Sequence, residues 1–251
     1  MKVIIAKDKE ELGESAGTFA ASLIRIAIKE KGKANIILAT GTSQFETLEQ
    51  LTAEDDIEWS KVTLFHLDEY IGLSVNHLAS FRRYLQERFL SKVPSLLAVY
   101  LINGEGNIED EIINLNKIIR DHPIDVALVG IGENGHLAFN DPPADFQTDE
   151  PYLVVNLDEP CRQQQMGEGW FASLEDVPLQ AISMSIRQIM MSENIICSVP
   201  DKRKAIAVRN SLENTVSNQI PASVLQEHPN CTFFLDRKSS SLLKNEFSIH
   251  N

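Results

Sequence analysis

The chain has 251 residues, 43% of them hydrophobic, and can therefore bury the core of one large domain or of two small ones. Its formal net charge of -13 argues against nucleic acid or an anionic membrane surface as its main partner. The sequence has no long apolar stretch like those of signal peptides and membrane spans, and its three cysteines form no metal-ligand pattern. We therefore expect a cytoplasmic protein with free thiols and without a metal site.

Strand and helix patterns alternate along the chain from its first residues. Short runs of β-branched and apolar residues between turn residues predict strands at 3–5, 35–39, 62–67, 97–102, 124–129, 153–157, 181–186, 195–199 and 231–235. Helical spacing and capping residues predict helices at 8–31, 45–51, 78–89, 108–119 and 202–212. This order predicts right-handed crossovers and an α/β fold with a mainly parallel, Rossmann-like sheet that helices cover on both faces.

The segment 140–178 differs from the rest of the chain, because it contains five prolines and several polar runs. It is the least regular region of the sequence, and we interpret it as a lid or an insertion over a site. The chain has neither an internal repeat nor a low-complexity linker. We therefore predict a single domain over residues 1–251, with this segment as its irregular part.

The most specific motif is the run GIGENGHLAFNDPP at 130–143. It follows a predicted strand, so its glycines, Gly135 among them, form a loop at a strand end, where open α/β sheets bind their ligands. Their spacing is not that of a dinucleotide fingerprint. Most lone histidines are structural, but His136 is held in this turn with Asp141 five residues on. A histidine that a carboxylate orients can transfer protons near neutral pH.

Asp68 is a second candidate, because it directly follows the apolar run 62–67 and stands at the mouth of the predicted sheet. Burial at such a place can raise the pKa of a carboxyl group into the range that suits a general base. Judged by position alone, a strand-end acid more often caps a turn or binds an arginine.

A third candidate is an anion site formed by Thr40-Gly41-Thr42-Ser43, between a predicted strand and a predicted helix. Backbone N–H groups, hydroxyls and the helix N-terminus can face an anion there, although such loops also serve simply as turns. Lys204 lies in the first turn of the predicted helix 202–212, where the helix dipole disfavours a cation unless an anion offsets it. Lys202 and Arg203 are interpreted as solvated surface residues.

Together these motifs resemble the glucosamine-6-phosphate deaminase (isomerase) family, including its galactosamine-6-phosphate isomerase-like members. The resemblance extends from the loop at 40–43 to the segment 221–229. It implies a three-layer α/β/α fold and isomerisation of a 2-amino-2-deoxyhexose 6-phosphate, with loss of the amino group as ammonia. Neither a metal nor an organic cofactor is implied, and the sequence has no zinc-type His/Cys cluster and no Walker lysine.

The resemblance also assigns roles to individual residues. The aspartate that matches Asp68 moves a proton between C1 and C2 of the opened sugar, and Glu69 is expected beside it. The histidine that matches His136 assists opening of the pyranose ring, with partners that match Asn134 and Asp141. The loop at 40–43 and Lys204 match the family's phosphate contacts.

Three departures from the family pattern affect the details of the site. Many members carry aspartate at the position of Asn134 and glutamate at that of Asp141. Many also supply a second phosphate-binding cation, an arginine, from the segment that here spans 166–171, and this segment contains none. We expect Arg162 or Arg187 to replace it.

Two other functions remain open from the sequence. A 6-phosphogluconolactonase shares the fold and a Gly-His turn, and would use His136 as a base without needing Asp68. A non-catalytic sugar-phosphate sensor is the second, although such regulators usually add a helix-turn-helix, and this chain starts directly with a strand. The retention of both residues and the run after His136 favour a deaminase. The expected partner is a small sugar phosphate, not nucleic acid or a membrane, and homo-oligomerisation stays open.

Overall fold

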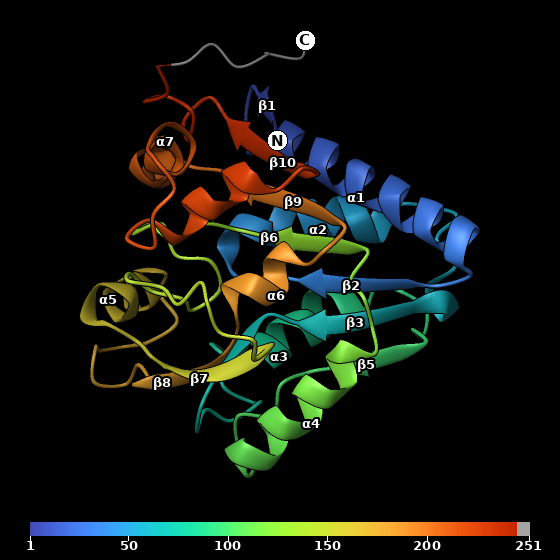
Figure 1. Cartoon of the computed structure of the whole chain (residues 1–251), viewed down its shortest axis with the longest axis horizontal. Coiled ribbons are helices and arrows are strands. Elements are labelled where there is room, and N and C mark those ends of the chain that lie inside the picture. The colour runs from blue at the N-terminus through green and yellow to red at the C-terminus, as the bar shows by residue number, and fades with distance from the viewer. Residues whose placement is uncertain (245–251) are drawn as a thin grey trace.

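The computed structural model describes residues 1–244 and is built around a seven-stranded parallel sheet (Figure 1). The strand order in this sheet is β1-β10-β9-β6-β2-β3-β5. A second, antiparallel sheet has the order β4-β8-β7. The strands are β1 (Lys2–Ala6), β2 (Ala34–Leu38), β3 (Val62–His66), β4 (Asp68–Tyr70), β5 (Ala98–Tyr100), β6 (Val126–Val129), β7 (Tyr152–Asn156), β8 (Gln180–Met184), β9 (Asn194–Val199) and β10 (Cys231–Asp236).

Helices and helical turns connect these strands. The α-helices are α1 (Lys9–Lys31), α2 (Phe45–Ala53), α3 (Phe81–Leu85), α4 (Ile108–Arg120), α5 (Glu159–Gly167), α6 (Ile186–Met190) and α7 (Ala205–Glu213). Short 3-10 turns are η1 (Thr42–Gln44), η2 (Trp59–Lys61), η4 (Lys202–Lys204) and η5 (Pro221–Glu227), and one π-helical turn is η3 (Gln86–Leu90). None of the helices described in residues 1–244 has the length and apolar composition that crossing a membrane requires.

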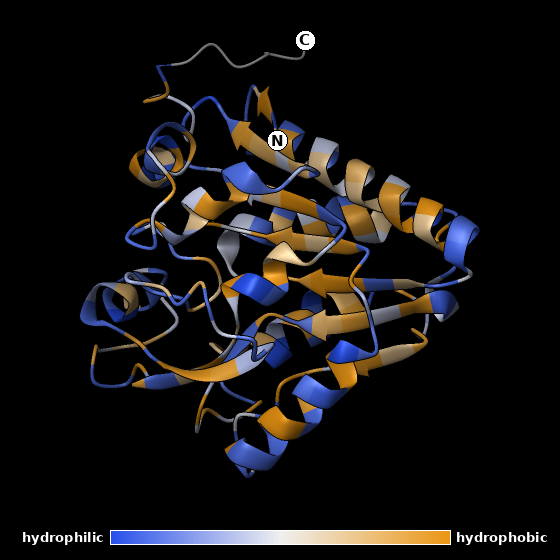
Figure 2. Ribbon diagram, in the orientation of Figure 1, coloured by the Kyte–Doolittle hydropathy of each residue, from blue (hydrophilic) through white to orange (hydrophobic). Residues whose placement is uncertain are grey.

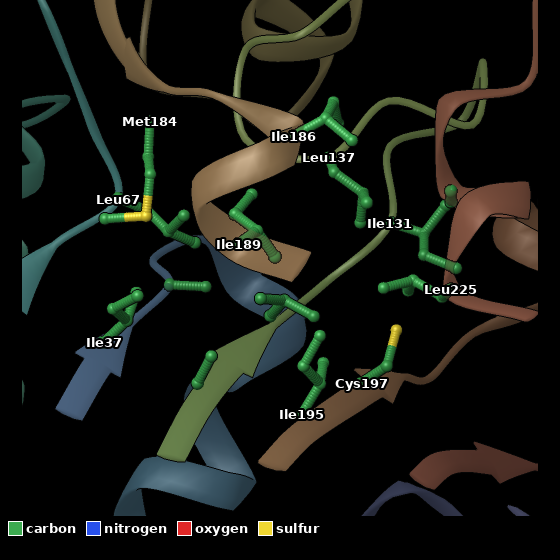
Figure 3. Close-up of a cluster of buried hydrophobic side chains, with 14 of the residues drawn as sticks. Ile37, Leu67, Ile131, Leu137, Met184, Ile186, Ile189, Ile195, Cys197 and Leu225 are labelled. Atoms are coloured by element: carbon green, nitrogen blue, oxygen red, sulfur yellow. The ribbon is translucent and has the colours of Figure 1, made fainter. Parts of the chain in front are cut away.

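The large sheet has a hydrophobic core on each face, because neighbouring residues of a strand point to opposite sides. In β2, Ile36 packs into the core shared with α1, α2 and α3, whereas Ile37 packs into the core shared with α4, α6 and α7. The strands are accordingly apolar almost throughout in Figure 2. Figure 3 shows Ile189 of α6 in the middle of this second core, between Leu67 and Ile195, and Ile186 beside Leu137. The predicted three-layer α/β/α fold is confirmed.

The helix that follows the loop at 40–43 lies unusually close to α1. A side chain at Gly13 of α1 would place its Cβ only 2.3 Å from the Cβ of Glu46 in α2, so glycine permits this approach. The ends of α1 agree with the sequence, because the Asp8 carboxylate accepts a hydrogen bond from the backbone N–H of Glu11 and Gly32 has a φ of 75°. Tight packing of α2 on α1 fixes the start of α2 relative to the sheet.

The antiparallel sheet was not expected, and it changes how two segments are understood. The predicted strand 181–186 pairs antiparallel with β4 and β7 and does not join the parallel sheet. It ends at Met184, because the Ser185 side chain accepts a hydrogen bond from the backbone of Gln188 and starts α6. The segment 140–178 contains β7 and α5, so it is more regular than predicted. Alternation of apolar residues predicts that a strand exists but does not name its partner.

The parallel strands all end on one side of the sheet, and Figure 1 shows α5 and α7 on that side. β2 and β6 are neighbours, but the chain leaves them toward opposite faces, since α2 packs on one core and the segment after β6 on the other. Such a switch point opens a crevice at the carboxyl ends of the strands. The fold therefore brings the loops that follow β2, β3, β6 and β9 together.

Candidate active site

A pocket opens at this switch point, at the carboxyl ends of the parallel strands. Strand-end loops and α5 form its walls. The residues that line it are Ala39, Thr40, Gly41, Thr42, Ser43, Leu67, Asp68, Phe81, Gly130, Ile131, Gly132, His136, Ala138, Phe139, Gln164, Gln165, Glu168, Arg203 and Lys204.

Asp68 is the first residue of β4, and among the acids that line the pocket its pKa is shifted most strongly. Its side chain is buried, and among residues 1–244 no group donates a hydrogen bond to its carboxylate. Burial, with a smaller contribution from the neighbouring charge of Glu69, raises the pKa of Asp68 to about 8. A carboxyl group with this pKa takes up and releases a proton near neutral pH, as a general base must.

His136 lies at the opposite wall in a tight glycine turn. A Cβ on Gly132 would lie 2.3 Å from the imidazole ring, so the ring can occupy this place only beside glycine. The Nδ1 atom of His136 is 3.0 Å from Oδ1 of Asp141, although the ring N–H does not point directly at this oxygen. Because the imidazole ring lines the pocket, its other nitrogen, Nε2, is available to a bound substrate.

Asp141 is held by several donors at once. The Asn134 amide donates to Oδ1 over 3.0 Å, and the backbone N–H of Asp158 donates to Oδ2 over 3.4 Å. Burial alone would raise the pKa of Asp141, but the contacts with His136, Asn134 and Asp158 outweigh burial and lower it. Asp141 is therefore ionised where Asp68 is largely protonated.

The expected contact between Asn134 and the imidazole is absent. Asn134 instead accepts a hydrogen bond from the backbone N–H of His136 over 3.0 Å and donates to Asp141. It orients the carboxylate and the backbone, and reaches the ring only through them. Gly135 lies at the tip of this turn with a φ of 89° and is not in the pocket lining.

The loop at 40–43 forms the far end of the pocket together with η4. Gly41 has a φ of 94° and its carbonyl accepts a hydrogen bond from the Tyr84 hydroxyl over 2.9 Å. Lys204 is only 3% exposed, and burial lowers its pKa to about 8, while the charge of Glu168 opposes this effect. The conformation of η4 is strained at its start, because Asp201 has a φ of 86°.

Arg203 is the site residue that the sequence did not reveal. It is an exposed residue, as the sequence predicts, but its Nη2 atom donates to Oγ1 of Thr42 over 2.8 Å and its side chain lines the pocket. The two residues are 161 positions apart in the sequence. Their contact depends on the pairing of β9 and β6 beside β2, which periodicity alone does not predict.

The other expected cations lie elsewhere. Arg162 donates to the backbone carbonyls of Leu174 and Val177 and does not line the pocket. Arg187 is 53% exposed and paired with Asp149 on the surface. Neither of them is brought to the loop at 40–43.

Glu69 does not line the pocket either. Its carboxylate is fully buried and accepts hydrogen bonds from the Ser80 hydroxyl over 2.8 Å and from the backbone of Arg82 over 2.9 Å. It thus satisfies the first N–H groups of α3. Glu69 acts on the site through the position of α3 and through its charge beside Asp68, and expecting it to contact substrate is not supported by this geometry.

α5 supplies a wall that was not predicted as a helix. It contributes Gln164 and Gln165 to the pocket, and Glu168 follows its last turn. Asp158 accepts a hydrogen bond from the backbone of Cys161 over 2.7 Å and so caps the start of α5. This aspartate followed by a proline two residues on is a helix-start signal that could have been recognised.

Residues 7–234 match the family described as glucosamine-6-phosphate isomerases/6-phosphogluconolactonase. The chain belongs to this family. A glucosamine-6-phosphate deaminase of Lactobacillus delbrueckii subsp. bulgaricus is 34% identical over 97% of this chain and 100% of its own length. A glucosamine-6-phosphate deaminase of Streptococcus pneumoniae is 36% identical over 86% of this chain and 92% of its own.

Solved structures agree with this membership. A monomeric glucosamine-6-phosphate deaminase superimposes with a TM-score of 0.86 at 33% identity, covering 96% of this chain and 100% of the other. The 6-phosphogluconolactonase of Thermotoga maritima superimposes with a TM-score of 0.76 at 18% identity, covering 94% of this chain and 100% of the other. The second likeness concerns the fold alone. The family resemblance recognised from the sequence is confirmed.

Proposed function

We propose that the protein converts a 2-amino-2-deoxyhexose 6-phosphate, glucosamine 6-phosphate or its galactosamine epimer, into a ketohexose 6-phosphate and ammonia. The observation that carries this proposal is a pair of acids whose pKa values are shifted in opposite directions, Asp68 in the pocket wall and Asp141 behind the His136 ring that lines the pocket. Asp68 is a buried carboxyl with a raised pKa, and Asp141 is an ionised carboxylate beside His136. In such a pair the acid with the raised pKa transfers protons, and the ionised acid orients and stabilises the neighbouring catalytic side chain. The deaminase relatives support the same choice of reaction.

The reaction follows from these positions. His136 passes a proton between the anomeric hydroxyl and the ring oxygen, and the pyranose ring opens. Asp68 then removes the proton from C2 of the open aldose and returns it to C1, while one proton passes from the C2 amine to the oxygen on C1, so that the amine becomes an imine. Water adds to C2 and ammonia leaves, so the sum is one water consumed and one ammonia released.

The phosphate group is proposed to bind between the loop at 40–43 and η4. Lys204 and Arg203 supply positive charge there, and the hydroxyl of Thr42 is already a partner of Arg203. In an acidic protein the buried Lys204 and the more exposed Arg203, side by side at the pocket, are the expected partners of an anion. We infer that Arg203 takes the place of the arginine that other members carry in the segment 166–171.

We also propose that the chain is a single domain in which 140–178 serves as a lid, since α5 forms one wall of the pocket. Residues 245–251 of this predicted domain lie outside the described part of the chain. A cytoplasmic location and the absence of nucleic-acid binding are proposals too. They are supported by the net charge of -13 and by three cysteines that are free and buried.

A lactonase is the less favoured alternative. Hydrolysis of a lactone needs a base to activate water but moves no proton between carbon atoms. A buried Asp68 with a raised pKa would then have no role in the reaction. The structures of 6-phosphogluconolactonases share the fold at 15–20% identity.

An ammonia-release assay tests the reaction directly. The purified chain is given glucosamine 6-phosphate, galactosamine 6-phosphate, their 2-acetamido forms and 6-phosphogluconolactone. We expect ammonia from a free 2-amino sugar phosphate and no turnover of the lactone. Lactone hydrolysis without ammonia release would reverse the choice between the two reactions.

The phosphate site is tested by Lys204→Met, with Lys202→Met as the matched control from the same turn. A charge-assisted hydrogen bond contributes about 1.5–3 kcal/mol, so Lys204→Met should weaken sugar-phosphate binding about 10- to 100-fold. Lys202 is exposed and does not line the pocket, so its loss should change binding less than about twofold. Arg203→Met should resemble Lys204→Met. Equal inhibition of the Lys204 variant and wild type by inorganic phosphate would place the anion elsewhere.

A further inference from the structure

Three different metal-binding side chains meet behind the pocket, on the side of His136 that faces away from substrate. The Nδ1 atom of His136, a carboxylate oxygen of Asp141 and the Sγ atom of Cys161 all lie within 4.8 Å of one another. Within residues 1–244 this is the single group of three or more such side chains. Two come from the turn after β6 and one from the first turn of α5, so the two walls of the pocket meet here.

Nδ1 of His136 is the second observation that points to a ligand. The atom is buried and has no hydrogen-bond partner with good geometry, even though the Asp141 carboxylate is 3.0 Å away. Buried polar atoms without a partner are uncommon, because leaving one costs free energy. A cation between the two residues and the thiol would satisfy Nδ1 through its lone pair.

The donor set selects a class of metal. One imidazole nitrogen, one carboxylate oxygen and one thiolate sulfur are ligands that zinc accepts, whereas magnesium and calcium prefer oxygen alone. Bonds from zinc to nitrogen and sulfur are about 2.0–2.3 Å long, so its ligand atoms lie about 3–4 Å apart. Nδ1 and Oδ1 already have this separation, and Sγ of Cys161 lies within 4.8 Å of the other ligand atoms.

We propose that His136, Asp141 and Cys161 form an inhibitory site for zinc or a similar thiophilic divalent cation. Binding breaks the S–H bond of Cys161, forms a metal–sulfur bond and releases one proton to solvent, while the ring proton of His136 moves to Nε2 so that the lone pair of Nδ1 binds the metal. The metal then binds both Nδ1 of His136 and the carboxylate of Asp141 and interrupts their direct contact. His136 can then no longer open the sugar ring.

Neighbours of the three proposed ligands reach the surface along α5. A surface hollow is lined by Glu133, Asn134, Pro160, Gln163, Gln164, Gly167 and Arg203. Asn134 is the amide that binds Asp141, and Pro160 precedes Cys161. Burial and the nearby Asp141 raise the pKa of the Cys161 thiol, so the site is protonated and open to a metal only at the cost of that proton. These features fit a metal ion that binds reversibly and inhibits the enzyme, and not a metal ion that is permanently bound as a cofactor.

Cadmium is the probe for the first experiment, because its thiolate complexes absorb in the ultraviolet. Titration of the purified full chain should give one thiolate-type absorption per chain. Cys161→Ser should lose this absorption and weaken cadmium binding by about 10-fold or more. Cys197→Ser is the matched control, because Cys197 is equally buried but lies in β9 away from the cluster, and it should behave as wild type.

Asp141→Asn tests the same metal site in case Cys161→Ser does not fold. It leaves the thiol and imidazole in place, so it should retain the absorption and bind cadmium more weakly. Zinc should then slow wild-type turnover, chelation should restore it, and magnesium should have no effect. Each variant is compared with its own metal-free rate. No cadmium binding by wild type, or an absorption that survives Cys161→Ser, would overturn the proposal while leaving the deaminase assay unaffected.

Discussion

The end of β3 and the turn after β6 each carry one aspartate of the candidate site, Asp68 in the pocket wall and Asp141 behind His136, and their surroundings shift the pKa values of the two carboxyl groups in opposite directions. Asp68 is buried without a donor, and its pKa is raised to about 8. Asp141 is nearly as buried, yet it accepts hydrogen bonds from Asn134 and from the backbone of Asp158, lies 3.0 Å from Nδ1 of His136, and has a lowered pKa. Burial therefore does not decide the charge of an acid. The number of hydrogen-bond donors that the local backbone and side chains supply decides it.

Asp68→Asn should have the largest effect, because it removes the base and keeps its size. We expect kcat to fall by about 10²–10⁴-fold with little change in substrate binding. Steady-state ammonia release measures this. If the variant turns over within threefold of wild type, Asp68 has a structural role only and the contrast with Asp141 has no chemical meaning.

Asp141→Asn should have an intermediate effect, since it removes the charge that orients His136 and leaves the base intact. By analogy with the carboxylates that orient metal-binding histidines, activity should fall by about 10- to 100-fold. Asn134→Ala is the control. It removes one of the donors to Asp141 and should cost only a few-fold. A larger loss for Asn134→Ala than for Asp141→Asn would show that the amide has a direct role.

The pH dependence of kcat/KM sharpens the same contrast, because this ratio reports groups of the free enzyme. Asp68 works in its ionised form, and its pKa is about 8. The ratio should rise about tenfold for each pH unit below 8 and level off above. A rising limb near pH 4 would show that Asp68 titrates as an ordinary carboxyl group and that its burial is relieved in solution.

The smallest expected effect is on stability, and its sign is opposite to that on activity. The pKa of Asp68 is higher in the folded protein than the value of about 3.9 in an unfolded chain, so the folded state holds the proton longer. Wild type therefore loses stability as pH rises from about 4 to 8. Asp68→Asn should be more stable at pH 8, with a gain that shrinks toward pH 5.

Thermal unfolding at the two pH values measures this gain. For a chain of this length each kcal/mol shifts Tm by about 2–4 °C. Asp141→Asn is the matched opposite case, because its folded pKa is lowered and its loss should destabilise the protein at pH 8. Two variants with the same sign at pH 8 would contradict the proposed difference between the regions.

Most strands and helices could be predicted from the sequence, because each depends on residues close together in the chain. Asp8 and Gly32 at the ends of α1 act over one helical turn. His136 and Asp141 are likewise five residues apart, and Gly132 shapes their turn locally. The partners of β8 could not be predicted, because pairing depends on which strands the whole fold brings side by side.

The sequence by itself determined the alternation of strands and helices, the strand-end place of Asp68 and the turn that holds His136. All three follow from local periodicity, backbone sterics and short-range hydrogen bonds. Only the tertiary structure decided which arginine lies at the pocket. Arg203 reaches Thr42 across 161 residues, while Arg162, an equally plausible candidate by its spacing, binds backbone carbonyls instead. A long flexible side chain finds its partner through the packing of distant strands, and sequence spacing carries no information about that distance.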